Sequence, residues 1–77
     1  MSCRVGITTN PEERKRYWQN RVNGFRAWNI IGQYPTKDQA QQHEDNYARQ
    51  SGCEAHAGGP DTPGTWYVYT FQFTSPK

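Results

Sequence analysis

Apolar and polar positions along the chain predict three strands. Val5 and Ile7 alternate with small or polar residues over roughly residues 3–9, which is typical of a strand. A second run, residues 28–34, is apolar on both faces at its centre and favours a buried middle strand. Residues 66–73 give the strongest strand signal, because aromatic and β-branched side chains occupy both faces.

Two helices are predicted between these strands. The first covers roughly residues 11–22, with Asn10 as its cap and Glu13 at the capping-box position. Asn23-Gly24 should end it, because glycine tolerates the left-handed closing conformation.

The second helix should begin after Thr36, which can cap it with Gln39 at the capping-box position. It runs to about Gln50 or Ser51, and Gly52 closes it. The spacing i, i+3, i+4, i+7, i+8 places one stripe of this helix inward, namely Ala40, His43, Glu44, Tyr47 and Ala48.

The resulting order, β-α-β-α-β, predicts one α+β domain over residues 1–77, with a three-stranded mixed or antiparallel sheet flanked by two helices. Residues 54–64 are a loop by composition. A core of this size is marginal, so the three Trp, five Tyr and three Phe must supply much of the buried area.

No apolar run has transmembrane length, and the start lacks the apolar region of a signal peptide. We therefore expect a soluble, cytoplasmic protein without a membrane partner. Cys3 and Cys53 can form one bridge, but two scattered thiols are not a disulfide framework, and we expect them to stay reduced.

The charge is uneven. Residues 1–26 carry six Lys or Arg and two Glu, a net charge of +4, whereas the remainder carries three cations and five carboxylates, a net charge of −2. A basic N-terminal third suits a polyanion, because phosphate contacts release counterions. A solvated helix face explains the same cluster without a ligand.

Glu44 is unusual because its helical position is on the inward stripe. An inward carboxylate costs free energy unless it is paired or binds a metal. The alternatives are that it lies at the edge of the stripe and contacts water, or that it pairs with an arginine of the first helix.

Arg14 precedes Tyr17 and Trp18 by one helical turn, so it can point towards the sheet. A half-buried arginine is suited to holding a phosphate bidentately. Arg14 and Glu44 are then either an ion pair or the two ends of a phosphodiester site, because Mg²⁺ commonly takes one or two carboxylates plus phosphate oxygens.

The other candidates carry weaker signals. His43 is expected to be a satisfied, half-buried residue, and His56 lies in the predicted loop, where it can assist proton transfer. Tyr67 and Tyr69 are either sheet packing or an acid or base whose pKa a metal or arginine lowers. No Cys/His spacing for zinc occurs.

Residues 5–14, Val-Gly-Ile-Thr-Thr-Asn-Pro-Glu-Glu-Arg, resemble the second half of the GIY-YIG nuclease motif. In that family a strand with Tyr-Ile-Gly or Tyr-Val-Gly leads through a short turn into a helix bearing an essential Arg. Residues 30–44 resemble the next strand and the helix with an inward, metal-binding Glu. The resemblance covers roughly residues 4–52 and puts Arg14 and Glu44 at family site positions.

Two departures from the family pattern are present. The Gly-Ile-Tyr strand that normally comes first has no counterpart before Cys3, but a similar strand stands at residues 64–69. We infer a circular permutation in which this last strand lies antiparallel to residues 3–9 and the termini are close together. Arg4 replaces the tyrosine of the second motif, a proposed general base, and arginine cannot accept a proton at neutral pH.

The resemblance implies metal-dependent phosphodiester hydrolysis of nucleic acid, with DNA expected rather than RNA. Glu44 would hold a single Mg²⁺ or Mn²⁺, Arg14 would stabilise charge on the phosphate, and Tyr67, Tyr69 or His56 would activate water. Further phosphate contacts are expected from the basic residues Arg4, Lys15, Arg16 and Arg21.

Two alternatives stay open at this point. One is a nucleic-acid-binding module without turnover, and the other is a small protein-interaction domain that presents Trp18, Trp28 or the Gly-Pro loop. For hydrolysis or for binding of nucleic acid, a chain of 77 residues would need a homodimer or a partner protein to supply specificity.

Overall fold

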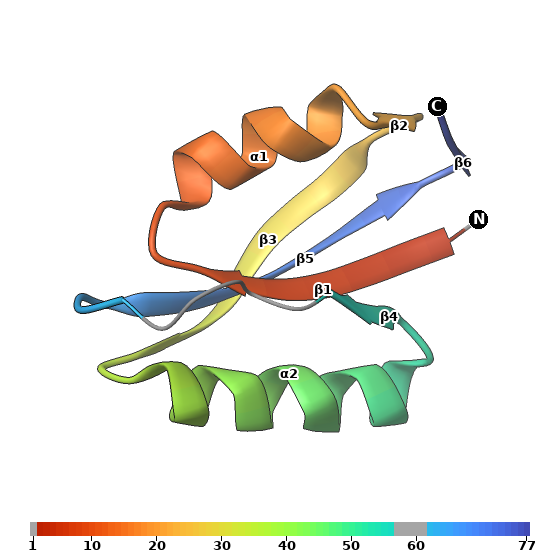
Figure 1. Ribbon diagram of the computed structural model, residues 1–77. Coiled ribbons are helices and arrows are strands. Elements are labelled where there is room, and N and C mark those ends of the chain that lie inside the picture. Colours follow the sequence, from red (N-terminus) through yellow and green to blue (C-terminus); the bar gives the residue numbers. More distant parts are fainter. Residues whose placement is uncertain (1, 57–61) are drawn as a thin grey trace.

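The computed structural model describes residues 2–56 and 62–77 as an α+β fold with two helices and a four-stranded main sheet, together with a two-stranded ribbon (Figure 1). The elements in chain order are β1 (Ser2–Thr8), α1 (Pro11–Gln19), β2 (Val22–Asn23), β3 (Arg26–Tyr34), α2 (Lys37–Ser51), β4 (Glu54–His56), β5 (Trp66–Phe73) and β6 (Ser75–Pro76).

The main sheet has the order β3-β5-β1-β4, and β5 pairs antiparallel with both β3 and β1. The expected neighbourhood of the last and first strands is therefore confirmed, with Ser2 opposite Phe73 and Thr8 opposite Tyr67. Both ends of the chain lie at the same side of the molecule (Figure 1).

The sheet has one strand more than predicted, because part of the expected loop is a strand. Residues Glu54–His56 form β4, which pairs parallel with β1 through Arg4 and Glu54. The rest of that loop includes residues 57–61, which lie outside the described residues. The composition of residues 54–56 favours a loop, but their backbone hydrogen bonds with β1 stabilise a strand.

The prediction that residues 28–34 form a middle strand is wrong, because β3 lies at the edge of the sheet. Among the described strands, β3 has β5 as its one neighbour in the main sheet, and Ile30 is 38% exposed. The register along β3 shifts twice, and Ala27 has a φ of 58°, as at a β-bulge that bends an edge strand. β5 occupies the centre because it is the strand whose two faces are both apolar.

Each face of the sheet carries one helix, α1 on one side and α2 on the other (Figure 1). The alternation of β5 divides the core accordingly. The buried residues on the α2 side are Val5, Ile7, Ala40, Cys53, Trp66 and Val68. The buried residues on the α1 side are Trp18, Val22, Tyr69, Phe71 and Phe73.

The first helix is shorter than predicted. It begins at the expected cap, where the Asn10 side chain accepts from the backbone amide of Glu13, but it ends at Gln19 with Asn20 as its cap. Val22–Asn23 were expected near the end of this helix, but they form β2 and pair with β6. Gly24 therefore follows a strand and does not close a helix. This pairing partner is distant in sequence, so local signals could not predict it.

The second helix matches its prediction. Thr36 accepts from the backbone amide of Gln39, and Gly52 closes the helix with a φ of 78°. The inward stripe is confirmed, with Ala40 and Glu44 buried.

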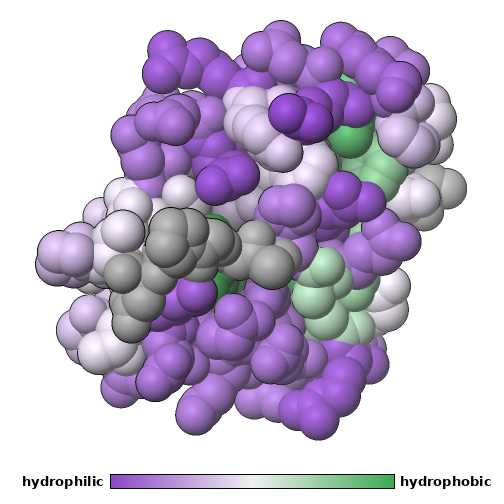
Figure 2. Space-filling view, in the orientation of Figure 1, coloured by the Kyte–Doolittle hydropathy of each residue, from purple (hydrophilic) through white to green (hydrophobic). Residues whose placement is uncertain are grey.

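The expectation that the cysteines stay reduced is contradicted by a disulfide between Cys3 and Cys53. Cys3 lies in β1 and Cys53 directly precedes β4, so the parallel pairing of these strands brings their Cα atoms to 4.9 Å. Among the helices of the described residues, none is long and apolar enough to cross a membrane. The face in Figure 2 is mostly hydrophilic, with apolar residues visible in small patches.

Candidate functional site

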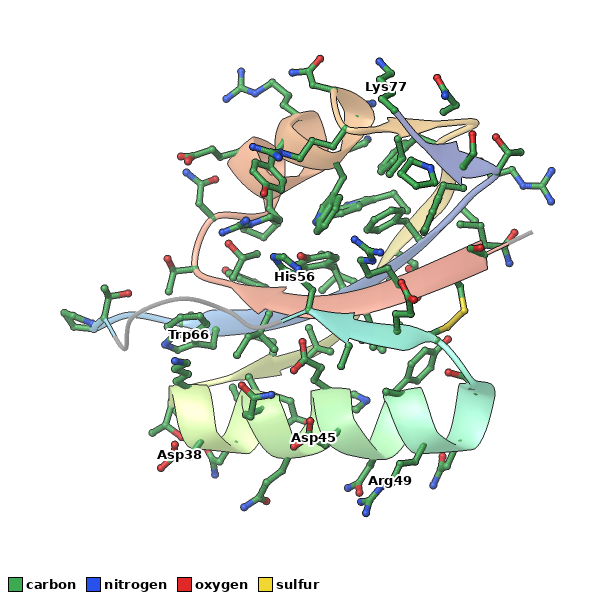
Figure 3. All side chains as sticks on the ribbon, turned by 45° about the vertical axis from the view of Figure 1, so that its right-hand side comes forward. Asp38, Asp45, Arg49, His56, Trp66 and Lys77 are labelled. Carbon is green, nitrogen blue, oxygen red and sulfur yellow. A yellow bond between two sulfur atoms is a disulfide. The ribbon has the colours of Figure 1, made fainter. Side chains whose placement is uncertain are left out.

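Three guanidinium groups gather near one histidine. Arg4 comes from β1, Arg14 from α1 and Arg21 from the turn after α1. His56 belongs to β4 and its ring meets the edge of Trp18 with 4.8 Å between ring centroids (Figure 3). Burial and then the charges of the three arginines lower the pKa of His56 below its ordinary value of 6.5. The imidazole is therefore neutral at pH 7, in a region of positive potential.

Tyr17 holds two of these arginines. The guanidinium carbon of Arg14 is 4.8 Å from the centroid of the Tyr17 ring, and that of Arg21 is 4.2 Å from it. Arg14 is three residues before Tyr17 on α1, a spacing at which helical side chains meet, whereas Arg21 approaches the ring from the turn after the helix. Arg14 is half-buried, as its place in the sequence predicted.

The hydroxyl of Tyr69 lies at the centre of the α1 side of the sheet. It accepts a hydrogen bond of 2.9 Å from the Trp18 indole, and the ring is fully buried. The ring passes over Gly6, where a Cβ would lie 2.3 Å from the Tyr69 oxygen. Burial raises the pKa of Tyr69 to about 12, although the Trp18 hydrogen bond and the charges of Arg14 and Arg4 lower it. Tyr69 therefore keeps its proton at neutral pH.

Glu44 is a fully buried carboxyl group on α2. Gln41, one turn earlier, donates to its Oε1, while Oε2 is buried and accepts no hydrogen bond from the residues that the structure describes. Burial raises the pKa of Glu44 from 4.5 to about 7; Gln41 lowers it, the charge of Asp45 raises it, and the nearby backbone amide of His56 lowers it. The expectation that Glu44 contacts water at the edge of the stripe is therefore wrong.

The expected ion pair between the helices is absent, because Arg14 and Glu44 are not in contact in the described part of the chain. Their helices lie on opposite faces of the sheet (Figure 1). Both charges nevertheless act on the same hydroxyl, since Arg14 lowers the pKa of Tyr69 and Glu44 raises it.

The remaining candidates separate into those near this site and those away from it. Tyr67 is half-buried and pairs across the sheet with Thr8 and Gln33. Lys15 and Arg16 belong to α1, with Lys15 half-buried and Arg16 exposed. His43 is half-buried and hydrogen-bonded to the Tyr34 hydroxyl at 2.9 Å, as predicted.

Two features of the site were not predicted. His56 was assigned to a loop, but its position in β4 fixes it beside β1. Gln41, which lies outside the predicted inward stripe, donates to Glu44. Gln41 stands three residues before the inward carboxylate of Glu44. This i, i+3 spacing is the sequence signal from which the hydrogen bond could have been predicted.

No family model, curated protein or solved structure matches this chain. What is established is a small α+β domain with a mixed sheet, a basic cluster and, within the residues that the structure describes, one buried carboxyl group.

Proposed function

We propose that this domain binds nucleic acid, DNA rather than RNA, and hydrolyses a phosphodiester bond in a GIY-YIG-like manner. The single observation that supports this is that Arg14 and Arg21 lie over the one ring of Tyr17, at 4.8 Å and 4.2 Å from its centroid, which concentrates positive charge suited to a phosphate. The sequence resemblance to that nuclease family puts Arg14 and Glu44 at site positions. The antiparallel neighbourhood of β1 and β5 is the pairing that a permuted chain requires.

A single divalent ion, Mg²⁺ or Mn²⁺, would be held by the buried Oε2 of Glu44, which accepts no hydrogen bond within the described residues. The described residues contain no group of three or more His, Cys, Asp or Glu that could hold a metal. Glu44 would therefore be the protein ligand, with water and phosphate oxygens completing the shell. When bound, the ion would supply positive charge against the phosphate oxygens.

The chain's own residues then divide the remaining work. Arg14 donates to the phosphate and stabilises the charge that develops on it. Tyr69 is protonated, so it donates a hydrogen bond rather than activating water, and neutral His56 is the better proton acceptor. Water forms a bond to phosphorus as the ester P–O bond breaks, His56 takes a proton from that water, and the leaving oxygen takes a proton from a second, solvent water molecule.

Binding without turnover is the second candidate, because of two observations. Arg4 stands where the family has a tyrosine, and its guanidinium adds charge for a phosphate. Glu44 and Tyr69 are both fully buried, whereas Arg4, Arg14 and His56 are half-buried. A phosphate can contact the half-buried groups without contact with the carboxyl group.

Nicking of supercoiled plasmid separates these candidates. Hydrolysis requires nicking that depends on Mg²⁺ or Mn²⁺ and falls in Glu44→Gln, while Asp45→Asn, its exposed neighbour, remains active. Arg14→Gln should reduce the rate by about 10²- to 10³-fold, as for other losses of a transition-state donor. Salt-sensitive DNA binding without nicking, unchanged in Glu44→Gln, would support the second candidate.

A protein-interaction domain would show neither nicking nor salt-dependent DNA binding. Such a result would end both nucleic-acid proposals. A cytoplasmic location and a homodimer or partner protein that supplies specificity stay predictions.

A further inference from the structure

A cavity of about 350 Å³ lies beside the arginine cluster. Its volume falls in the range of small-ligand sites. Its cationic lining comes from Arg4, Arg21 and Lys77, and His56 and Tyr17 also contribute to the wall. We call it the Arg4 cavity.

The C-terminal segment completes this cavity. The backbone amide of Lys77 donates to the carbonyl of Arg21 at 3.0 Å, and β6 pairs with β2. In Figure 3, Lys77 lies at the end of α1, on the α1 side of His56. Residues from both ends of the sequence therefore contribute cations to one hollow.

Aromatic rings hold two of the cations in place. The guanidinium carbon of Arg4 is 4.9 Å from the centroid of Trp18 and 5.3 Å from that of Phe73. Arg21 lies 4.2 Å from the centroid of Tyr17, the ring that also carries Arg14. Planar guanidinium groups held in this way lose little conformational freedom when an anion binds.

One carboxylate opposes this charge. Glu54 accepts from the Nη2 of Arg4 at 2.6 Å, while the Nε of Arg4 is buried and finds no hydrogen-bond partner in residues 2–56 and 62–77. The Glu54 side chain is 68% exposed, whereas that of Arg4 is 24% exposed. An exposed carboxylate can turn into water, so an incoming anion can replace it on Arg4.

We propose that the Arg4 cavity binds a second phosphate group of the nucleic-acid strand, next to the phosphate held by Arg14, and that it does so on an unpaired strand. This inference rests on the proposed function and names the substrate class of its site. Arg4, Arg21 and Lys77 supply the charge, and Tyr17 aligns the two phosphate sites by holding Arg14 and Arg21 on one ring.

The preference for an unpaired strand follows from the recess of Arg4. A phosphate must enter the cavity to replace Glu54 on a guanidinium that is only 24% exposed. The backbone of a duplex is stiff, with a persistence length of about 150 base pairs, so its phosphates stay on a regular cylinder. An unpaired strand can bend a phosphate inward.

Small ligands with one or two phosphates test the second site directly. Thymidine 3′,5′-bisphosphate and thymidine 5′-monophosphate are titrated while the indole N–H signal of Trp18, next to Arg4, is followed by NMR. We expect the bisphosphate to bind about tenfold more tightly, because its second phosphate gains a charge-assisted contact that the monophosphate lacks. Arg21→Gln should abolish this advantage, and Arg49→Gln, exposed on α2, should preserve it.

Glu54→Gln should change the binding affinity in the opposite direction from Arg21→Gln, and it tests the proposal on a surface residue. Removal of the competing carboxylate should strengthen binding of an unpaired dT oligonucleotide about threefold, whereas Arg4→Gln should weaken it. If the Arg4–Glu54 pair were only structural, both variants would lower the free energy of unfolding and neither would strengthen binding. Such a result would overturn the proposal.

Oligonucleotide affinities separate failure of this inference from failure of the proposed function. We expect the unpaired dT oligonucleotide to bind more tightly than the same length of duplex at one salt concentration. Equal affinities and no bisphosphate advantage, with binding still dependent on Arg14, would overturn the second phosphate site and leave the proposed function standing. Loss of all DNA binding would overturn both.

Discussion

The Trp18 indole donates a buried hydrogen bond of 2.9 Å to the Tyr69 hydroxyl, across 51 positions of the sequence. It joins α1 to the central strand β5 and fixes the hydroxyl against Gly6. Because the Trp18 ring also meets His56 edge-on and carries the Arg4 guanidinium over its face, this bond connects the helix to the candidate site.

Tyr69→Phe should destabilise the fold. The Trp18 N–H would be left buried without an acceptor, which costs about 1–3 kcal/mol of unfolding free energy. Urea unfolding of the variant measures this loss. Tyr67→Phe is the matched control on the same strand face, and because Tyr67 is only half-buried its effect should be small. Equal losses in both variants would contradict the role of the hydrogen bond.

Gly6→Ala should be destabilising for a steric reason. The new Cβ would lie 2.3 Å from the oxygen of Tyr69 and 2.5 Å from its Cζ, so the fully buried ring would have to move. Overpacking of this kind costs about 1–3 kcal/mol. Combined with Tyr69→Phe, which removes the nearest atom, the loss should be smaller than the sum of the single losses. Simple additivity in urea unfolding would argue against the contact.

Glu44 should make stability depend on pH. Burial raises its pKa from 4.5 to about 7, so the folded state binds the proton more strongly than the unfolded state. The free energy of unfolding should therefore fall as the pH rises from about 4.5 to about 7, and this contribution should level off above that range. Urea unfolding at closely spaced pH values measures the slope.

Glu44→Gln should remove this slope, and Asp45→Asn should retain most of it. His56 contributes with the opposite sign, because its lowered pKa means that stability falls as the pH drops below 6.5. The difference between wild type and Glu44→Gln at each pH isolates the carboxyl group. A difference that is constant over this range would show that the burial of Glu44 does not shift its pKa.

The disulfide should contribute strongly to stability. Cys3 and Cys53 are 50 positions apart, and closing a loop of this length stabilises a fold by about 2–4 kcal/mol. Reduction should lower the free energy of unfolding by this amount, which appears as a lower midpoint concentration of urea. The double variant Cys3→Ser, Cys53→Ser should be insensitive to reductant. Alkylation in denaturant counts the thiols. An unchanged midpoint in fully reduced protein would contradict this prediction.

The sequence alone determined the elements whose signals are local. Thr36 and Gly52 mark the ends of α2, and both act as caps through contacts within one turn. The double apolar character of residues 66–73 indicated a strand with two covered faces. Arg14 and Glu44 were identified as candidates because helical spacing turns both side chains towards the sheet. A charge in such a position costs free energy unless it has a partner or a ligand.

Only the tertiary structure decided which strands are central and which residues complete the site. Residues 28–34 are as apolar as expected of a central strand. In the structure, however, β5 lies at a central position and β3 lies at the edge of the sheet. Residues 54–56 became a strand because β1 offered them backbone partners, and this pairing placed His56 by the arginines and Cys53 by Cys3. Hydrogen bonds and burial between distant segments have no local signature, so composition could not predict them.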